Sequence, residues 1–371
     1  MSVIYYATEI HIDFGIVSTL GEHCRSLGIR KPLLVTDETL VHAGIAKRAS
    51  EALDGISHET FSEVLPNPRE GLVDAALDLY SRSQCDGLLG LGGGSVIDTA
   101  KAVGLLASNG GRIGDYVGPV NRPITNHLPP IIAIPTNAGS GSEISRGLGV
   151  GIGESGSKAN LLHPKLFPTL AICDPELTFS VPRELTAMSA IDALSHCIEG
   201  FISPRINPPV AAIALDGARR VWEHVETAVT QPFDRVARWE MMMGSIEGGM
   251  AMPKGLGTAH ALAIPLDRLH LPHGAIISVL LPKVIRWYGN FIDQKRGALL
   301  AALGLQPNAN LADALEKMCM RLGLPTSLRS LGVPKAVFPE IADSAVASPY
   351  QQISVKPASC ESYIEILESA F

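Results

Sequence analysis

The first half of the chain alternates short apolar runs with stretches whose apolar residues recur at helical spacing. Four short runs predict buried strands, at 32–36, 86–91, 131–134 and 170–173. Two longer stretches predict helices, at 43–53 and 96–106. Strands that alternate with helices are typical of a mostly parallel sheet covered by helices. We therefore expect an α/β domain in this half.

The hydrophobic pattern changes in the second half of the chain, where strand-like runs become rare after residue 182. Five stretches rich in Ala, Leu, Met and Glu predict helices, at 183–202, 208–230, 233–252, 256–268 and 309–322. The apolar run Ile276–Leu281 fits a strand or a buried helix equally well. We predict two domains, an α/β domain over 1–180 and an all-helical domain over 181–371.

Composition narrows the class of protein. The chain has 371 residues, of which 46% are hydrophobic, and its net charge is −7, from 30 Lys and Arg against 37 Asp and Glu. This sign is the opposite of that of a nucleic-acid binder, and the apolar content excludes disorder. There is no signal peptide pattern, no apolar run of about 18–20 residues and no Cys-x-x-Cys pair. We expect a cytoplasmic protein that binds neither nucleic acid nor membrane.

Two glycine-rich segments follow predicted strands. The first, Gly92-Gly-Gly-Ser95, opens the helix predicted at 96–106. Glycines allow close approach of a ligand, and free N–H groups at a helix start suit a phosphate, although the segment also fits a tight strand–helix turn. The second segment is Pro135-Thr-Asn-Ala-Gly-Ser-Gly-Ser-Glu143. Both would lie at the carboxyl edge of one sheet, where open α/β sheets bind ligands, so we expect the turns at 92–94 and 139–141 to lie at a ligand site.

Asp37 directly follows the first predicted strand. A carboxylate at this position suits a hydrogen bond to a ribose hydroxyl. A helix-capping or turn aspartate explains it as well.

An acidic residue and several histidines stand out in the helical half. Asp192 and His196 are four residues apart, so they share one face of the predicted helix, and His260 and His273 follow later. One carboxylate and three imidazoles suit a divalent metal such as Fe(II) or Zn(II). A hydrogen-bonded Asp–His pair without metal is the competing interpretation.

Taken in order, these segments resemble the iron-containing (group III) alcohol dehydrogenase family. The resemblance runs from about residue 10 to 290 and rests on five segments: Gly92–Ser95 with Asp98 and Lys101, Pro135–Glu143, Asp174–Leu177, Asp192–Glu199 and Leu271–Gly274. It implies the dehydroquinate synthase-like fold: a Rossmann-like N-terminal domain, a helical metal-binding C-terminal domain, and an active site in the cleft between them.

The resemblance also implies roles for individual residues. The metal ligands match Asp192, His196, His260 and His273. The pyrophosphate contacts match Gly93, Gly94 and Ser95, with Asp98 near the nicotinamide ribose. The second nucleotide loop matches Thr136, Ser140 and Ser142, and Lys158 and Asp37 match contacts to the cofactor's riboses. A carboxylate at Asp37 would repel a 2′-phosphate, so NAD is favoured over NADP.

The activity implied by the resemblance is reversible hydride transfer between NAD and a small alcohol or aldehyde, with a divalent metal, Fe(II) or Zn(II), polarising the substrate oxygen. The family also implies a homodimer. A dehydroquinate synthase-like lyase on the same scaffold is the alternative, as is a catalytically silent nucleotide-binding protein.

The chain departs from the family pattern after its third ligand. The family often has His-x-x-x-His-Pro-Leu-Gly, whereas this chain has Ile264 in place of the second His and Asp267 in place of the Gly. His270 is our candidate for the missing proton relay, with a surface histidine as the plainer interpretation. Arg268 and Arg146 would favour an anionic substrate, such as a sugar acid or a sulfonate or phosphonate aldehyde, if they face the active site. Each also fits an ordinary surface ion pair.

Overall fold

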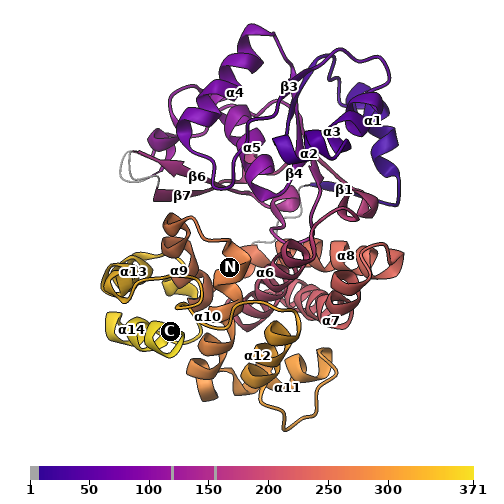
Figure 1. Cartoon of the computed structure of the whole chain (residues 1–371). Coiled ribbons are helices and arrows are strands. Elements are labelled where there is room, and N and C mark those ends of the chain that lie inside the picture. The colour runs from indigo at the N-terminus through magenta and orange to yellow at the C-terminus, as the bar shows by residue number, and fades with distance from the viewer. Residues whose placement is uncertain (1–7, 118–120, 154–156) are drawn as a thin grey trace. The chain divides into compact units, whose positions relative to one another are not determined.

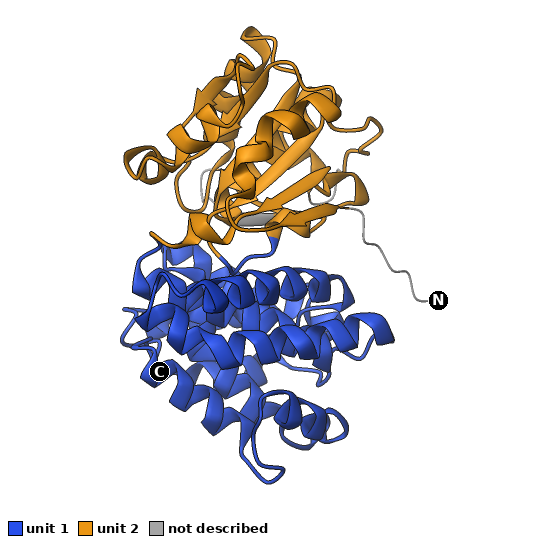
Figure 2. Cartoon of the chain, turned by 90° about the vertical axis from the view of Figure 1, so that its right-hand side faces the viewer, with its two compact units in different colours: residues 1–5, 138–141, 181–371 blue, residues 6–137, 142–180 orange. Residues whose placement is uncertain are grey.

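The computed structural model describes residues 8–117, 121–153 and 157–371, with the backbone alone for 157–159. The chain forms two compact units, drawn in different colours in Figure 2. An α/β unit extends to Asn137 and continues over 142–180. A helical unit comprises 181–371 together with the short segment 138–141.

A parallel six-stranded sheet forms the centre of the α/β unit (Figure 1). Its strands follow the order β1-β8-β5-β4-β2-β3. The strands are β1 (Glu9–Ile12), β2 (Pro32–Val35), β3 (Glu59–Phe61), β4 (Gly87–Gly92), β5 (Ile131–Pro135) and β8 (Leu170–Cys173). The predicted parallel sheet is therefore confirmed. Outside it, β6 (Gly147–Ile152) pairs antiparallel with β7 (Ser157–Leu162).

Side chains along each strand alternate between two hydrophobic cores, as the pleat requires. In β2, Leu33 and Val35 enter one core, and Leu34 enters the other. The first core is closed by α4 (Glu70–Arg82) and α5 (Gly94–Asn109), and the second by α1 (Leu20–Ser26) and α3 (Ile45–Glu51). The short α2 (Glu38–His42) precedes α3. Burial on both faces explains why these strands read as continuous apolar runs.

The strand order reverses beside β4. The chain passes from β2 outward to β3, returns to β4 on the other side of β2, and then continues outward through β5 to β8. The turns after β2 and β4 therefore diverge at the carboxyl edge of the sheet. Such a switch point is where open α/β sheets bind ligands.

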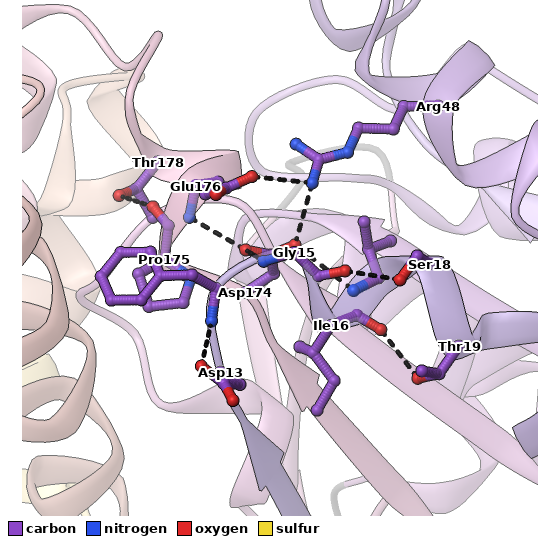
Figure 3. Close-up of polar contacts among 12 residues, drawn as sticks. Asp13, Gly15, Ile16, Ser18, Thr19, Arg48, Asp174, Pro175, Glu176 and Thr178 are labelled. Atoms are coloured by element: carbon purple, nitrogen blue, oxygen red, sulfur yellow. Dashed lines mark hydrogen bonds and ion pairs between the residues drawn. The ribbon is translucent and has the colours of Figure 1, made fainter.

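The buried carboxylate of Asp174 fastens the end of β8 to its neighbours (Figure 3). Its oxygens accept hydrogen bonds from the N–H groups of Gly15 at 2.9 Å and Glu176 at 3.0 Å. Arg48 adds ion pairs to Asp174 at 3.4 Å and to Glu176 at 2.9 Å. Gly15 has φ +77°, a conformation that favours glycine. The Asp174–Leu177 segment thus links the end of β8 to the segment after β1 and to α3.

The helical unit contains nine α-helices in the part of the chain that the structure describes. They are α6 (Arg183–Ile202), α7 (Pro208–Thr230), α8 (Arg235–Ala251), α9 (Thr258–Leu266), α10 (His273–Tyr288), α11 (Asp293–Ala302), α12 (Leu311–Arg321), α13 (Phe338–Ala347) and α14 (Cys360–Ser369). The ambiguous run Ile276–Leu281 lies inside α10. The helical run 273–302 has the length and apolarity of a membrane span, but 67% of its apolar window is buried, as in a core helix.

Two lysines close the carboxyl end of α6. Lys254 is buried, and its Nζ donates to the carbonyl oxygens of Gly200, Phe201 and Ser203 at 2.7–3.0 Å. Lys295 donates to the carbonyls of Phe201, Ile202 and Ser203. Ammonium groups satisfy the last carbonyls of a helix and complement its negative end. The helix that holds Asp192 and His196 is thereby fixed at its end.

Candidate metal centre and nucleotide-binding turns

Asp192 and His196 lie on successive turns of α6. The distance between Asp192 Oδ1 and His196 Nε2 is 3.6 Å. Both residues are almost entirely withdrawn from solvent, with side chains 13% and 5% exposed. A buried carboxylate requires a partner or a cation. The i,i+4 spacing therefore produces the shared face that the sequence predicts.

Two further histidines converge on the same carboxylate oxygen. His260, from α9, places Nε2 3.8 Å from Asp192 Oδ1, and His273, the first residue of α10, places Nε2 at 3.6 Å. The rings of His196 and His260 stack with centroids 4.9 Å apart, and those of His260 and His273 lie 5.5 Å apart. The four residues predicted as metal ligands are thus brought together in the helical unit.

The donor atoms of this cluster fit a metal ion. Candidate ligand atoms of Asp192, His260 and His273 all lie within 4.8 Å of one another. Within the described chain, Asp192 Oδ1 and His260 Nε2 are buried and have no hydrogen-bond partner. Buried polar atoms without partners are costly, and a cation placed between them would satisfy them. One carboxylate oxygen with imidazole nitrogens is a donor set for divalent iron or zinc.

Burial and neighbouring charges shift the pKa values of the cluster in different directions. Burial opposes ionisation of Asp192, but the imidazoles of His196, His260 and His273 outweigh it and hold the pKa of this carboxyl well below its usual range. Burial lowers the pKa of His196 to about 4, which leaves a neutral imidazole with a free lone pair. Burial also lowers the pKa of His260, but the carboxylates of Asp192 and Glu199 outweigh it and raise that pKa to about 9.

Two carboxylates that the sequence reasoning did not assign lie behind the histidines. Glu199 accepts a hydrogen bond from His260 Nδ1 at 2.6 Å and from the N–H of Ala259 at 2.8 Å. Asp267 lies 2.9 Å from His273 Nδ1. Glu199 could have been found from its spacing, since it follows His196 by three residues on the same helix. No spacing rule points to Asp267.

The structure places His270 differently from the four clustered residues. It is exposed, has φ +58°, and ends the 3-10 segment η7 (Asp267–Leu269). In the described chain it makes no hydrogen bond to the cluster. Its proposed proton-relay role stays a prediction. Arg268, beside it in sequence, forms an ion pair with Glu340, which agrees with the plainer interpretation of this arginine.

The first glycine-rich turn joins β4 to the start of α5. Gly93 is the residue before the helix, and Gly94 and Ser95 are its first two residues. Gly93 has no side chain that could cap this 16-residue helix. The N–H groups of its first residues, Gly94 and Ser95, can therefore bind an anion. A Cβ on Gly92 would lie 2.6 Å from Val96, which shows that close packing also requires glycine there.

Asp98 and Ser142 form a direct hydrogen bond beside a buried lysine. Ser142 Oγ donates to Asp98 Oδ1 at 2.5 Å, and the N–H of Gly149 donates to the other carboxylate oxygen at 2.8 Å. Lys101 is fully buried, and its Nζ donates to Ser142 Oγ and to three carbonyl oxygens of this segment. Lys101 therefore anchors the loop that follows β5. The nucleotide contacts predicted for Asp98 and Ser142 remain predictions.

The second glycine-rich segment packs tightly in the helical unit. A Cβ on Gly139 would lie 2.8 Å from Cβ of Ser189 on α6, and one on Gly141 would lie 2.6 Å from Cα of Gly249 on α8. Packing alone therefore requires these glycines. Thr136, at the end of β5, is buried, and Ser140 is half-buried. Their nucleotide contacts also stay predictions.

The remaining predicted cofactor residues lie on other parts of the α/β unit. Asp37 caps α2, because its Oδ1 accepts from the N–H of Leu40 at 3.0 Å. The capping interpretation is therefore correct, and the ribose contact of Asp37 stays a prediction. Lys158 pairs with Gly151 in the hairpin of β6 and β7, and its side chain lies outside the described part of the chain.

The comparisons with known proteins all point to one family of dehydrogenases. The family model for iron-containing alcohol dehydrogenase matches residues 7–175, and that for the C-terminal part of the same family matches 186–371. A 4-hydroxybutyrate dehydrogenase of Cupriavidus necator is 41% identical over the full length of both chains. A crystal structure of 1,3-propanediol oxidoreductase superposes over the whole of both chains with a TM-score of 0.94 at 31% identity. The structure of sulfoacetaldehyde reductase from Bifidobacterium kashiwanohense in complex with NAD+ covers 100% of this chain and 98% of its own, with a TM-score of 0.92 at 27% identity.

Proposed function

Because the chain belongs to the iron-containing alcohol dehydrogenase family, we propose that it interconverts a small alcohol and its aldehyde by hydride transfer with NAD. The observation that supports this most directly is the convergence of three imidazole Nε2 atoms on Asp192 Oδ1 at 3.6–3.8 Å. The family match also favours a dehydrogenase over a lyase on the same scaffold.

The residues that would hold the metal are Asp192, His196, His260 and His273. A bound divalent ion supplies a Lewis acid that polarises the substrate oxygen and lowers the pKa of an alcohol. The chain contributes ligand side chains that are largely shielded from water, since those of Asp192 and His260 are 13% and 3% exposed. Glu199 and Asp267 fix two of the imidazole rings by accepting from their Nδ1 atoms. The same donors bind iron and zinc.

The residues that would hold NAD follow from the α/β unit. NAD supplies the hydride acceptor for alcohol oxidation. The N–H groups of Gly94 and Ser95 at the start of α5 bind its pyrophosphate, with Gly93 allowing close approach. Further contacts are assigned to Asp37, Asp98, Thr136, Ser140, Ser142 and Lys158. The NAD+ complex of the 27% identical sulfoacetaldehyde reductase supports this choice of cofactor.

Metal analysis combined with NADH oxidation against a panel of aldehydes tests the proposal. We expect the purified protein to carry a divalent ion and to oxidise NADH with at least one short-chain aldehyde. Chelation of the ion should abolish the activity, and added Fe(II) or Zn(II) should restore it. Activity that is unchanged after complete removal of the ion would refute the metal-dependent mechanism.

An ω-hydroxy acid is the second candidate substrate. It is favoured by the 41% identical 4-hydroxybutyrate dehydrogenase and by the sulfoacetaldehyde reductase structure. Arg268 forms an ion pair with Glu340. Arg146 lies beside the second glycine-rich segment, and we take it as the candidate for a carboxylate contact. Succinic semialdehyde and butanal should be compared in the wild type and in Arg146→Ala. Equal effects on both aldehydes would eliminate an anion-specific role for Arg146.

Asp37 should set the preference for NAD over NADP. Asp37→Ser keeps a good helix cap but removes the charge. Two unit charges 4 Å apart in water repel by about 1 kcal/mol, and a 2′-phosphate carries nearly two charges. We therefore expect the ratio of kcat/KM for NADPH to that for NADH to rise by about 10-fold.

The matched control for this substitution is Asp234→Ser. Asp234 caps α8 by accepting from the N–H of Ala237 at 2.8 Å, as Asp37 caps α2. Asp234→Ser should leave the ratio of kcat/KM for NADPH to that for NADH unchanged. An unaltered ratio in Asp37→Ser as well would remove Asp37 from the nucleotide site.

The finer assignments complete the proposal. The small-molecule substrate is a family property, whereas a cytoplasmic location and a homodimer are our proposals for this chain. Light scattering on the purified protein measures the oligomeric state directly.

A further inference from the structure

The segment between His260 and His273 contains this chain's departure from the family motif. Asp267 stands where the motif has glycine, at the end of α9 and the start of η7. It is 2% exposed, and its Oδ1 lies 2.9 Å from His273 Nδ1. We propose that Asp267 is a positioning residue that fixes the ring of His273 and thereby strengthens metal binding. This inference rests on the proposed function only in taking the four-residue cluster as a metal site.

His273 needs such a partner more than the other two histidines do. Its side chain is 25% exposed, against 5% for His196 and 3% for His260. It is the first residue of α10, and the residue before it, Pro272, supplies no side-chain cap. A histidine ring has a broad torsional preference about its last bond, so loose packing leaves its orientation undetermined. A hydrogen bond at Nδ1 supplies the missing constraint.

The same hydrogen bond also selects the tautomer. A neutral imidazole has one donor nitrogen and one acceptor nitrogen. When the carboxylate of Asp267 accepts from Nδ1–H, the lone pair is left on Nε2, the atom that lies 3.6 Å from Asp192 Oδ1. Carboxylate-backed histidines of this kind raise ligand basicity and fix ring orientation at metal sites.

The other end of the cluster shows the same arrangement built independently. Glu199 accepts from His260 Nδ1 at 2.6 Å and is itself held by the N–H of Ala259. Glycine at position 267 would offer no side-chain acceptor, so His273 would depend on solvent. Asp in place of Gly at 267 therefore provides His273 with a carboxylate acceptor at Nδ1, as Glu199 on α6 does for His260.

Charge reinforces the geometry. Asp192, Glu199 and Asp267 place three carboxylates around three imidazoles, all within hydrogen-bonding or ion-pairing distance of a ring. Added negative charge close to a buried site strengthens the binding of a cation. We therefore expect unusually firm metal retention.

Chelator competition on the full chain measures this directly, with Zn(II) and Co(II) as the probes. Asp267→Gly restores the motif residue and should weaken the affinity for either ion by about 10- to 100-fold. Asp267→Asn keeps an acceptor oxygen without the charge and should lose less. The visible absorption of the Co(II) form should change in Asp267→Gly, because the orientation of one ligand is no longer fixed.

Glu340→Gln is the matched control, because Glu340 lies on α13 and pairs with Arg268, the residue next to Asp267. It should leave metal affinity and the Co(II) spectrum unchanged. If Asp267→Gly does not fold, Asp267→Asn provides the same comparison. Affinity within about twofold of wild type and an unchanged Co(II) spectrum in the folded variants would overturn the inference. The two proposals can fail separately. If the wild type oxidises no alcohol but the Asp267 variants still bind metal more weakly than it does, the proposed function is refuted and the role of Asp267 stands.

Discussion

Asp192→Ala is expected to abolish metal binding and to lower kcat by about 1,000-fold or more. Asp192 Oδ1 lies 3.6, 3.8 and 3.6 Å from Nε2 of His196, His260 and His273. Without it, the remaining proposed ligands are imidazoles, and none of the proposed ligand atoms carries the negative charge that offsets a divalent ion. Loss of a Lewis acid costs several kcal/mol of transition-state stabilisation, and about 4 kcal/mol corresponds to about 1,000-fold in rate.

Stability measurements separate this loss from misfolding. The imidazoles around Asp192 hold the pKa of its carboxyl low, so its replacement by Ala should lower the free energy of unfolding of the metal-free protein, which urea denaturation measures. The wild type should gain thermal stability when Zn(II) is added, and the variant should not.

The exposed carboxylate of Asp343, on α13 of the same unit, provides the control. Asp343→Ala should retain metal, activity and the Zn(II)-induced rise in Tm. Full metal content in Asp192→Ala, measured on folded protein, would contradict the ligand assignment.

The sequence predicts long helices and buried strands well, because each has one strong pattern. The stretches predicted at 183–202 and 208–230 coincide with α6 and α7, and the run 170–173 coincides with β8. Ile276–Leu281 stayed ambiguous because α10 is buried on most sides, which removes the helical period.

Short strands with mixed composition were not predicted. β1 is a four-residue strand at the edge of the sheet, and β3 has three residues, and neither has the continuous apolar run that marks the buried strands β2 and β8. β6 is rich in glycine, which is depleted in strands. Pairing with neighbours, which local sequence does not encode, determines these elements.

Some contacts of the candidate site also follow from local sequence, whereas others depend on how the helices pack. Asp192 and His196 share a helix, so their proximity follows from spacing alone. The convergence of His260 and His273 on the same oxygen depends on how α9 and α10 pack against α6, and the resemblance to a family was needed to group them. Asp267 was visible only as a departure from a motif, and its contact with His273 required coordinates.

The buried lysine of the α/β unit leads to the other large expected effect. Lys101→Met is expected to lower the free energy of unfolding of this unit by about 3–5 kcal/mol. The side chain is 0% exposed, and its Nζ donates to the carbonyl oxygens of Ser142, Ser145 and Gly147 at 2.6, 3.0 and 2.8 Å. Methionine fills a similar volume but leaves these carbonyls without their donor, at about 1–3 kcal/mol for each buried group.

The same substitution should weaken NADH binding by about 10-fold or more. Lys101 and Asp98 together hold Ser142, which belongs to the proposed second nucleotide loop. Loss of this anchor lets the loop leave the geometry that binds the cofactor, and an ordering cost of about 1.4 kcal/mol corresponds to a factor of ten in affinity. Urea denaturation and NADH fluorescence titration measure the two effects separately.

Lys254→Met tests whether the effect on the cofactor is specific. Lys254 is also a buried lysine with three carbonyl acceptors, but it closes α6 in the helical unit. Its replacement should destabilise the protein to a similar extent and leave the affinity for NADH unchanged, because no proposed nucleotide contact depends on it. If both variants weaken NADH binding equally, general destabilisation explains the loss. If Lys101→Met alone does so, the buried ammonium group of α5 positions the nucleotide loop.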